Sequence, residues 1–234
     1  MLGWLYLPGD RPDRFAAAVA SKADAVLIDL KDAVARSRKD DARVAVASFL
    51  DSAAADRSPV PVWVRLNELG SPAFFADLAA LADIPGVAGL QLPKVESAAE
   101  VTRVAELCDK KLHLLIESAR GLELAFEIAT VHKAIAGIGL GETHLRADLG
   151  VTSEQGLQWA RGRIVVAARA AGLPAPAMSA YPQLSDLDGL RESCRAGRRL
   201  GFAGRVALHP LQLPVIVDSF RPSPREVERA PVPL

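Results

Sequence analysis

The feature that most constrains this fold is a regular alternation of short apolar runs with longer helix-like segments. About eight strand-then-helix units follow one another over roughly 220 residues. Short apolar runs bounded by charged residues are typical of strands covered on both faces, and strands that alternate with helices pair in parallel through right-handed crossovers. Eight units match the closure of a sheet on itself, so we predict an α/β fold, a single-domain TIM (β/α)8 barrel. An open doubly wound sheet also alternates, but no glycine-rich phosphate loop follows the first strand.

The barrel is expected to span residues 1–220, followed by a proline-rich C-terminal tail over 221–234. Proline lacks a backbone N–H and fixes its φ angle, so the prolines of the tail disfavour regular structure. The expected helices include Ala33–Leu50, Gly121–Val131 and Ser153–Ala171. The expected strands are Trp4–Leu7, Ala23–Leu30, Val60–Leu66, Val87–Leu92, Leu112–Ile116, Ala134–Leu140, Ala175–Ala180 and Arg205–Leu208.

Composition narrows the class of partner. Lysine plus arginine and aspartate plus glutamate number 28 each, so no net field draws the chain to nucleic acid or to an acidic membrane. Cys108 and Cys194 lack the spacing of a zinc site or a disulfide framework, which favours a reducing compartment. The chain shows no basic leader and no uninterrupted run of about 18 apolar residues. We therefore expect a cytoplasmic protein that binds a small molecule.

Charged residues recur where the predicted strands end. In a parallel barrel the carboxyl ends of the strands meet at one rim, which carries the ligand site. Glu117 and Arg120 follow the buried run that starts at Leu112, and we expect them to face that site. Taken alone, Glu117 is equally compatible with complementing the dipole of the following helix. The other residues at strand ends are Asp29, Lys31, Asp32, Arg65, Asn67, Lys94, Glu142, His144 and His209.

Side-chain chemistry predicts a division of labour at this rim. Arg65 is a permanent cation whose planar fork suits a carboxylate or an enolate, and its structural alternative is a pair with Asp29 or Asp32. Glu117 is a hard oxygen ligand of the kind that Mg²⁺ takes, and carboxylates on neighbouring strands would complete such a site. A divalent ion and an arginine together stabilise an enolate, which indicates the making or breaking of a carbon–carbon bond beside a carbonyl.

The four histidines divide between structural positions and the rim. His113 lies in an apolar strand and His132 at a helix end, so we expect both to be structural. His144 follows the sixth strand and is a candidate for the site. His209 precedes Pro210, and shaping the rim explains it at least as well as catalysis does.

Six motifs occur in order along nearly the whole chain. They are Leu-Pro-Gly-Asp-Arg-Pro-Asp-Arg-Phe (7–15), Asp-Leu-Lys-Asp-Ala-Val-Ala (29–35), Val-Arg-Leu-Asn (64–67), Leu-Pro-Lys-Val-Glu-Ser (92–97), Ile-Glu-Ser-Ala-Arg-Gly (116–121) and Leu-His-Pro-Leu-Gln-Leu-Pro-Val-Ile (208–216). Together they resemble the citrate lyase β-subunit-like branch of the HpcH/HpaI aldolase family. The resemblance implies a TIM barrel, usually a homotrimer, that binds Mg²⁺ and cleaves or forms a carbon–carbon bond in citryl-, citramalyl- or malyl-CoA.

The resemblance also implies roles for particular residues. Arg65 would hold a carboxylate or carbonyl of the substrate, Glu117 would ligate the metal, and Arg11 and Arg14 would lie near the thioester or its CoA. Combined with the rim residues, this gives candidate catalytic residues Arg65, Glu117, Asp32 and Lys94, candidate substrate-binding residues Arg11, Arg14, Arg65 and Asn67, and candidate metal ligands Glu117 and His144.

Three departures from the family pattern fall at the chemical centre. Family members usually have an acidic residue where Lys31 stands and an aspartate metal ligand where His144 stands. Imidazole is a poor ligand for Mg²⁺, so Mn²⁺ or another divalent ion is an alternative cofactor. Glu142 or Asp148 would have to replace the missing carboxylate, although both are displaced in register. The chain also stops at Leu234, before the C-terminal lid of the family, so we expect a wetter site.

Three functions are open at this point. The first is a divergent, metal-dependent lyase or aldolase that acts on a small 3-hydroxy acid or its CoA thioester through an enolate. The second is a catalytically degenerate barrel that binds a ligand or a partner subunit, which Lys31 and His144 motivate. The third is an acyl-CoA thioesterase.

Overall fold

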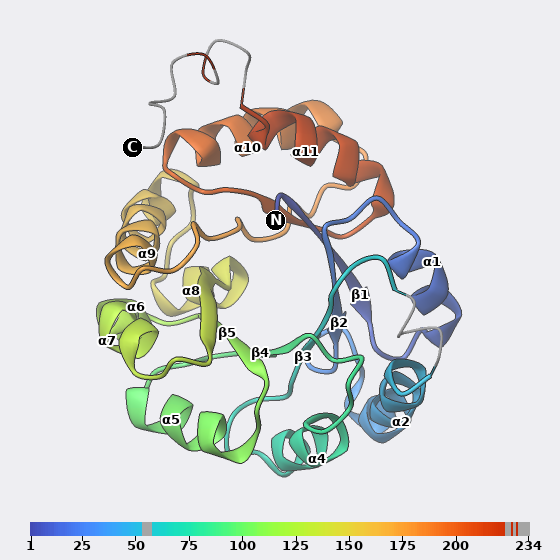
Figure 1. Cartoon of the computed structure of the whole chain (residues 1–234). Coiled ribbons are helices and arrows are strands. Elements are labelled where there is room, and N and C mark those ends of the chain that lie inside the picture. The colour runs from blue at the N-terminus through green and yellow to red at the C-terminus, as the bar shows by residue number, and fades with distance from the viewer. Residues whose placement is uncertain (53–57, 223–225, 227, 229–234) are drawn as a thin grey trace.

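The computed structural model describes residues 1–52, 58–222, 226 and 228. Its centre is a parallel sheet of seven strands in the order β6-β5-β4-β3-β2-β1-β7. The sheet is curled, and the helices form a ring around it (Figure 1). The strands are β1 (Gly3–Pro8), β2 (Ala25–Asp29), β3 (Val62–Arg65), β4 (Gly89–Leu92), β5 (Lys111–Ile116), β6 (Ile135–Leu140) and β7 (Arg205–Ala207).

Helices follow the strands along the chain, as the alternation predicts. Short 3-10 helices precede several of them, at Pro12–Arg14, Arg36–Arg38, Gln155–Leu157 and Pro210–Gln212. The α-helices are α1 (Phe15–Val19), α2 (Lys39–Leu50), α4 (Pro72–Leu81), α5 (Ala98–Leu107), α6 (Ala119–Glu123), α7 (Ala125–Thr130), α8 (Glu142–Asp148), α9 (Gln158–Ala170), α10 (Leu187–Arg199) and α11 (Leu213–Phe220).

The strand that should complete an eight-stranded barrel does not form as a strand. The parallel α/β fold is confirmed, but the segment predicted as Ala175–Ala180 makes only an isolated bridge, between Met178 and Arg205 of β7. On the other side, Ser179 Oγ donates a hydrogen bond to the last carbonyl of β6 at 2.6 Å. Pro176 has no N–H to give to a ladder, which limits pairing along this segment. A side chain therefore takes the place of a strand ladder beside β6.

The predicted helix boundaries need correction at three places. The predicted helix Ala33–Leu50 begins as an α-helix only at Lys39. The Asp29 carboxylate accepts the N–H of Ala33 at 2.7 Å, and this bond keeps the start of the predicted helix in a loop. The predicted helix Gly121–Val131 is the two short helices α6 and α7. The predicted helix Ser153–Ala171 becomes regular only in α9, and α8 was not predicted.

The inner face of the curled sheet changes character along the strands. Side chains alternate between the two faces of a strand, so every second residue shares one face. Toward the amino ends this face carries Trp4, Trp63 and His113, with the Trp4 ring centroid 5.6 Å from that of Trp63 and 5.8 Å from that of His113. Gly137 of β6 leaves room for the imidazole, because a Cβ there would lie 3.0 Å from its Cδ2 atom. This face of the sheet is therefore aromatic toward the amino ends of the strands.

Two further expectations concern the whole chain. In residues 1–52 and 58–222, no helix is both long and apolar enough to cross a membrane. Helix α11 ends at Phe220 and the backbone of Arg221 is extended. Most of the tail predicted over 221–234 lies outside the described residues, so its irregular structure stays a prediction.

The pKa of His113 predicts how stability depends on pH. Burial lowers this pKa to about 4 in the folded protein, whereas a histidine in an unfolded chain titrates near pH 6.5. The unfolded chain therefore takes up the proton first, so the contribution of neutral His113 to stability is complete above about pH 6.5 and is lost as the pH falls toward 4. Between about pH 7.5 and pH 4.5, we expect the unfolding free energy of the wild type to fall about 2–3 kcal/mol more than that of His113→Gln. Denaturant titrations measure this, and equal falls in the two proteins would contradict it.

Candidate functional site

Strand register brings the charged residues of the site together. In the ladder between β2 and β3, Asp29 lies directly opposite Arg65, and each is the last residue of its strand. Tyr6 reaches the same pair from β1, and Glu117 follows the end of β5. Because parallel strands end at the same edge, four different strands deliver these side chains to one place.

A buried pair between Asp29 and Arg65 is the centre of this cluster. Arg65 donates from Nε to Asp29 Oδ1 at 2.6 Å and from Nη2 to Oδ2 at 2.9 Å, a bidentate arrangement. Tyr6 donates its hydroxyl to Asp29 Oδ2 and accepts a hydrogen bond from Arg65 Nη2. Asp29 has no exposed surface and Arg65 is 7% exposed. The arginine therefore has two fixed sides, and only part of its guanidinium is left for a ligand.

The two charges shift each other's titration. Burial alone would raise the pKa of Asp29, but the hydrogen bonds and charge of Arg65 outweigh it and leave the pKa below its usual range. Burial likewise opposes the charge of Arg65, and Asp29 reverses this, so the pKa of the guanidinium is raised. Burial and the negative charge of Asp29 raise the pKa of Tyr6. Asp29 and Arg65 are therefore charged and Tyr6 is neutral near neutral pH.

Hydrogen bonds to the backbone N–H and the backbone carbonyl of Lys31 fix the loop after β2. Asp29 Oδ1 accepts the N–H of Lys31 at 2.9 Å, and Lys39 Nζ donates to the carbonyl of Lys31 at 2.8 Å. The loop thus places the Lys31 ammonium 3.1 Å from Glu117 Oε2 and 3.6 Å from Asp32 Oδ2. Asp32 Oδ2 in turn lies 3.1 Å from Arg65 Nη2. The Asp32 carboxylate is shared between the two cations.

Glu117 is the buried carboxylate on the other side of the site. Its side chain is only 2% exposed, and Oε2 accepts the backbone N–H of Lys94 at 3.1 Å in addition to the Lys31 contact. Its other oxygen, Oε1, lies 3.3 Å from His144 Nδ1 of α8. Gly141 closes against it, because a Cβ at this position would overlap Oε1. One alternative from the sequence was that Glu117 only complements the dipole of the following helix. In the structure its carboxylate contacts Lys31, Lys94 and His144, so it has partners within the site.

These side chains border one cavity at the carboxyl ends of the strands. The cavity has a volume of about 460 Å³ and is partly apolar, because Leu27, Leu115 and Val206 contribute to its lining. Its polar lining includes Tyr6, Asp32, Arg65, Gln91, Glu117 and His144. A cavity of this size suits a small carboxylic acid or the acyl end of a larger ligand.

Some predicted site residues lie elsewhere and have other partners. Arg11 pairs with Asp13 at 2.8 Å and is exposed. Arg14 is exposed at the end of the first 3-10 helix, and neither arginine lines the cavity. The Asn67 amide donates to Asp77 at 2.7 Å and its carbonyl accepts from Lys39, so this side chain supports the loops and does not line the cavity.

Lys94 contributes its backbone rather than its side chain. Its φ of +50° is in the left-handed region, which is uncommon for a residue with a side chain. In this conformation the backbone N–H of Lys94 donates a hydrogen bond to Glu117. The Lys94 ammonium donates instead to Glu68, at 3.1 Å. Arg120, also expected at the rim, is exposed and does not line the cavity.

Sequence reasoning missed three residues that build the site. The alternation of sides along β1 could have placed Tyr6 on the inner face, above Trp4. No sequence signal pointed to Lys39. From the first turn of α2, its ammonium donates hydrogen bonds to two backbone carbonyls and to Asn67. Ser179 was hidden in the segment that was expected to be a strand.

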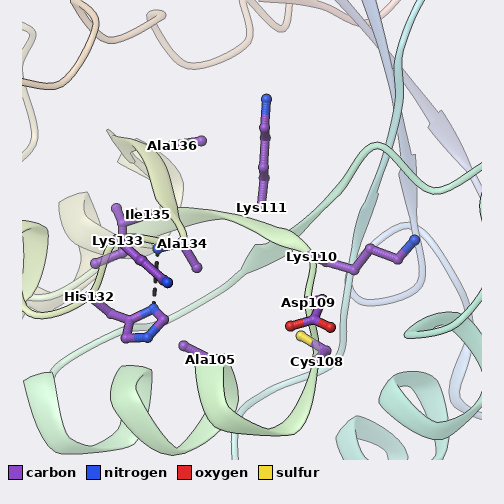
Figure 2. A pocket seen from close by; sticks show the side chains of 10 residues that line it. All are labelled: Ala105, Cys108, Asp109, Lys110, Lys111, His132, Lys133, Ala134, Ile135 and Ala136. Atoms are coloured by element: carbon purple, nitrogen blue, oxygen red, sulfur yellow. Dashed lines mark hydrogen bonds between the residues drawn. The ribbon is translucent and has the colours of Figure 1, made fainter.

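A second depression lies at the opposite, amino end of the strands (Figure 2). It has a volume of about 440 Å³ and holds none of the predicted site residues. Figure 2 shows the side chains of Lys110, Lys111 and Lys133 pointing away from one another, so they do not form a convergent anion site. His132 Nδ1 accepts the N–H of Ala134 at 3.1 Å, which gives it the structural role that was predicted.

The donor set of the site does not fit Mg²⁺. The predicted ligands Glu117 and His144 do meet, but Mg²⁺ prefers oxygen ligands in octahedral geometry, and an ammonium already contacts the Glu117 carboxylate. The residues proposed to replace the missing carboxylate have other partners. Both oxygens of Glu142 accept hydrogen bonds from Arg161, through Nε and Nη2, and Asp148 accepts the N–H of Ala119. Within the described residues, no group of three or more His, Cys, Asp or Glu side chains is able to hold a metal.

The fold and the site define a class: a parallel α/β protein with a small cavity, lined by charged and apolar side chains, at the carboxyl ends of its strands. Comparison with known proteins identifies the family. The model of the HpcH/HpaI aldolase/citrate lyase family matches residues 3–210, and the chain belongs to this family of aldolases and carbon–carbon lyases.

Individual relatives agree with this assignment. The chain is 37% identical to a citrate lyase subunit beta-like protein of Mycobacterium tuberculosis, an alignment that covers 94% of this chain and 79% of the relative. It is 36% identical to a (3S)-malyl-CoA thioesterase of Cereibacter sphaeroides, with 97% and 79% covered. A solved structure of CitE from M. tuberculosis in complex with magnesium, acetoacetate and coenzyme A has a TM-score of 0.83 at 35% identity, over 96% of this chain and 82% of that one.

The buried pair makes a testable contribution to stability. Asp29→Asn keeps the shape of the side chain but removes the buried counter-ion of Arg65, which then keeps only the partly exposed Asp32 carboxylate at 3.1 Å, so we expect the unfolding free energy to fall by about 3 kcal/mol. Asp40→Asn is a matched control: Asp40 also pairs with an arginine, at 2.6 Å, but its side chain is 92% exposed, and its loss should cost about 1 kcal/mol or less. Urea titrations of both variants measure the difference, and similar effects at the two positions would contradict the account.

Proposed function

We propose that this protein is a carbon–carbon lyase that acts on a small 3-hydroxy acid or its CoA thioester, of the citryl-, citramalyl- or malyl-CoA kind, through an enolate. Membership of an aldolase and citrate lyase family supports the reaction class. The M. tuberculosis relative, which binds acetoacetate and coenzyme A, supports the ligand class. The cavity beside Arg65 is of a size for the acyl part of such a substrate.

The observation that carries the proposal is the state of the Arg65 guanidinium. Nε and Nη2 bond to Asp29 and Tyr6, whereas Nη1 has no hydrogen-bond partner among residues 1–52 and 58–222. Since Arg65 lines the cavity, this nitrogen is free to donate to an anionic oxygen of a ligand. The pair with Asp29 fixes the donor before the ligand arrives, which is how an enzyme stabilises developing negative charge without reorganisation.

The reaction needs a base as well as a cation. Cleavage removes the proton of the 3-hydroxyl group, breaks the bond between C2 and C3, releases the carbonyl product and leaves an enolate that takes a proton at C2. His144 Nδ1 lies 3.3 Å from Glu117 Oε1, and the tautomer that carries its proton on Nδ1 keeps the lone pair of Nε2 for the hydroxyl proton. Its side chain is 40% exposed and lines the cavity, so a substrate can reach it. Arg65 then stabilises the enolate oxygen.

Thioester hydrolysis is the second candidate, and the same histidine supports it. A histidine oriented by a buried carboxylate is able to remove a proton from water as well as from a hydroxyl group. The identity to a (3S)-malyl-CoA thioesterase supports this alternative. The two reactions leave different products, because the lyase releases a carbonyl acid and an acyl-CoA whereas hydrolysis releases the free thiol of CoA.

We also propose that the protein is a homotrimer, as the family resemblance implies, and that it is located in the cytoplasm, as the composition predicts. An active site completed by a neighbouring subunit would be compatible with a cavity that is open at the rim.

The proposal is tested by turnover of citryl-, citramalyl- and malyl-CoA. We expect Arg65→Lys to lower kcat/KM by about 100-fold or more, because an ammonium cannot bond to Asp29 in two places and also offer a fixed donor to the enolate. Arg103→Lys, at an exposed position of α5, is the matched control and should leave kcat/KM unchanged. Carbonyl product and free thiol are measured separately. Free thiol alone would favour the thioesterase, and a folded protein that releases neither product would favour a binding role.

A further inference from the structure

The ammonium group of Lys31 lies between the two carboxylates that border the cavity. Its Nζ atom is 3.1 Å from Glu117 Oε2 and 3.6 Å from Asp32 Oδ2. The side chain is only 8% exposed and does not itself line the cavity, so it sits behind the two carboxylates rather than in the ligand space. The Lys31 ammonium is thus a cation that Glu117 and Asp32 share.

The position of this ammonium is fixed by its own backbone. Asp29 accepts the N–H of Lys31, and Lys39 donates to the carbonyls of Leu30 and Lys31 at 2.9 and 2.8 Å. Both sides of the Lys31 backbone are thus held by buried or half-buried charged groups. A side chain that starts from a fixed backbone loses little further freedom when it pairs with Glu117, which favours a permanent contact over a mobile one.

We infer that Lys31 supplies, as part of the chain, the positive charge that a divalent ion shared by Glu117 and Asp32 would otherwise supply, so that the site binds neither Mg²⁺ nor Mn²⁺. The inference about metal binding stands on the geometry alone. Its catalytic consequence, turnover without a metal, rests on the proposed lyase function.

Charge balance explains why such a cation is needed. Asp29 and Asp32 both pair with Arg65, and Glu117 adds a third carboxylate at the same cavity; without Lys31 this excess of negative charge would repel an anionic substrate. Lys31 neutralises one of these charges through direct contact. It acts through Glu117 and Asp32 and not on the reacting atoms, so it is a positioning and charge-balancing residue rather than a catalytic residue.

The same contacts exclude a divalent ion. Ligand oxygens approach Mg²⁺ to about 2.0–2.1 Å. An ion at that distance from Glu117 Oε2 would lie close to the ammonium, and the repulsion would have to be overcome without another free carboxylate, because Glu142 and Asp148 have other partners. Glu117 Oε1 faces His144 and Gly141, an imidazole and a backbone segment in place of the oxygen ligands that an octahedral Mg²⁺ shell takes.

The experiment is a Mn²⁺ titration of the purified full chain, followed by the free-ion signal in electron paramagnetic resonance. We expect no stoichiometric binding by the wild type at millimolar Mn²⁺. Lys31→Glu turns a repelling group into a ligand and should raise the affinity by about tenfold or more, because the number of charged ligands sets affinity for such ions. Lys31→Met, which removes the charge and keeps most of the side-chain volume, should give a smaller gain. Lys133→Glu, the same change at an exposed position near the amino ends of the strands, should give none.

Three results would overturn the inference. The first is one Mn²⁺ bound by the wild type and lost in Glu117→Gln. The second is no gain in Lys31→Glu and Lys31→Met when circular dichroism shows both variants folded, because Lys31 would then not be what excludes the ion. The third is an equal gain in Lys133→Glu. Lys31→Gln serves as a second neutral variant if Lys31→Met does not fold.

Turnover supplies a separate readout. If the wild type cleaves any of the CoA thioesters, EDTA should leave kcat unchanged, and loss of turnover that Mg²⁺ restores would overturn the catalytic part of the inference. If the folded wild type cleaves none of them, the proposed lyase function fails, while the Mn²⁺ titration still decides the claim about Lys31.

Discussion

The bidentate pair between Asp29 and Arg65 is the interaction on which the rest of the site depends. The Asp29 carboxylate has no exposed surface, and it also accepts the Tyr6 hydroxyl and the N–H groups of Lys31 and Ala33. One buried charge thus orients a guanidinium, a phenol and a loop. Because burying a charge is costly unless every partner is in place, this carboxylate links the stability of this edge of the sheet to the geometry of the cavity.

The sequence predicted which strand ends meet, and it offered the pairing of Arg65 with Asp29 or Asp32 as an alternative that the structure confirms, but it did not predict the partners of most other side chains. Parallel strands that alternate with helices bring Arg65 and Glu117 to one rim whatever their exact register, so both positions followed from the pattern alone. Partner choice depends on distances of a few ångströms between segments far apart in sequence. The sequence therefore predicted that Asn67 binds the substrate. In the structure its side-chain amide is hydrogen-bonded to Asp77 and Lys39.

Local propensity also failed where tertiary contacts decide. The segment after Ala33 has helical periodicity, but its first residues form a loop because Asp29 accepts the N–H of Ala33. The segment around Met178 reads as a weak strand, but only one bridge forms, and Ser179 bonds to β6 through its side chain. Both misassignments occur beside the site, where backbone groups bond to side chains instead of to a neighbouring turn or strand.

We propose that Lys31 and His144, at positions where the family resemblance implies acidic residues, distinguish this site from a magnesium site. The measurement that tests this most directly is an anomalous-scattering map from crystals soaked in MnCl₂. The account predicts no anomalous peak within bonding distance of Glu117 or Asp32, with Lys31 Nζ between the two carboxylates. A manganese peak bonded to both carboxylates, with the Lys31 side chain displaced, would contradict it.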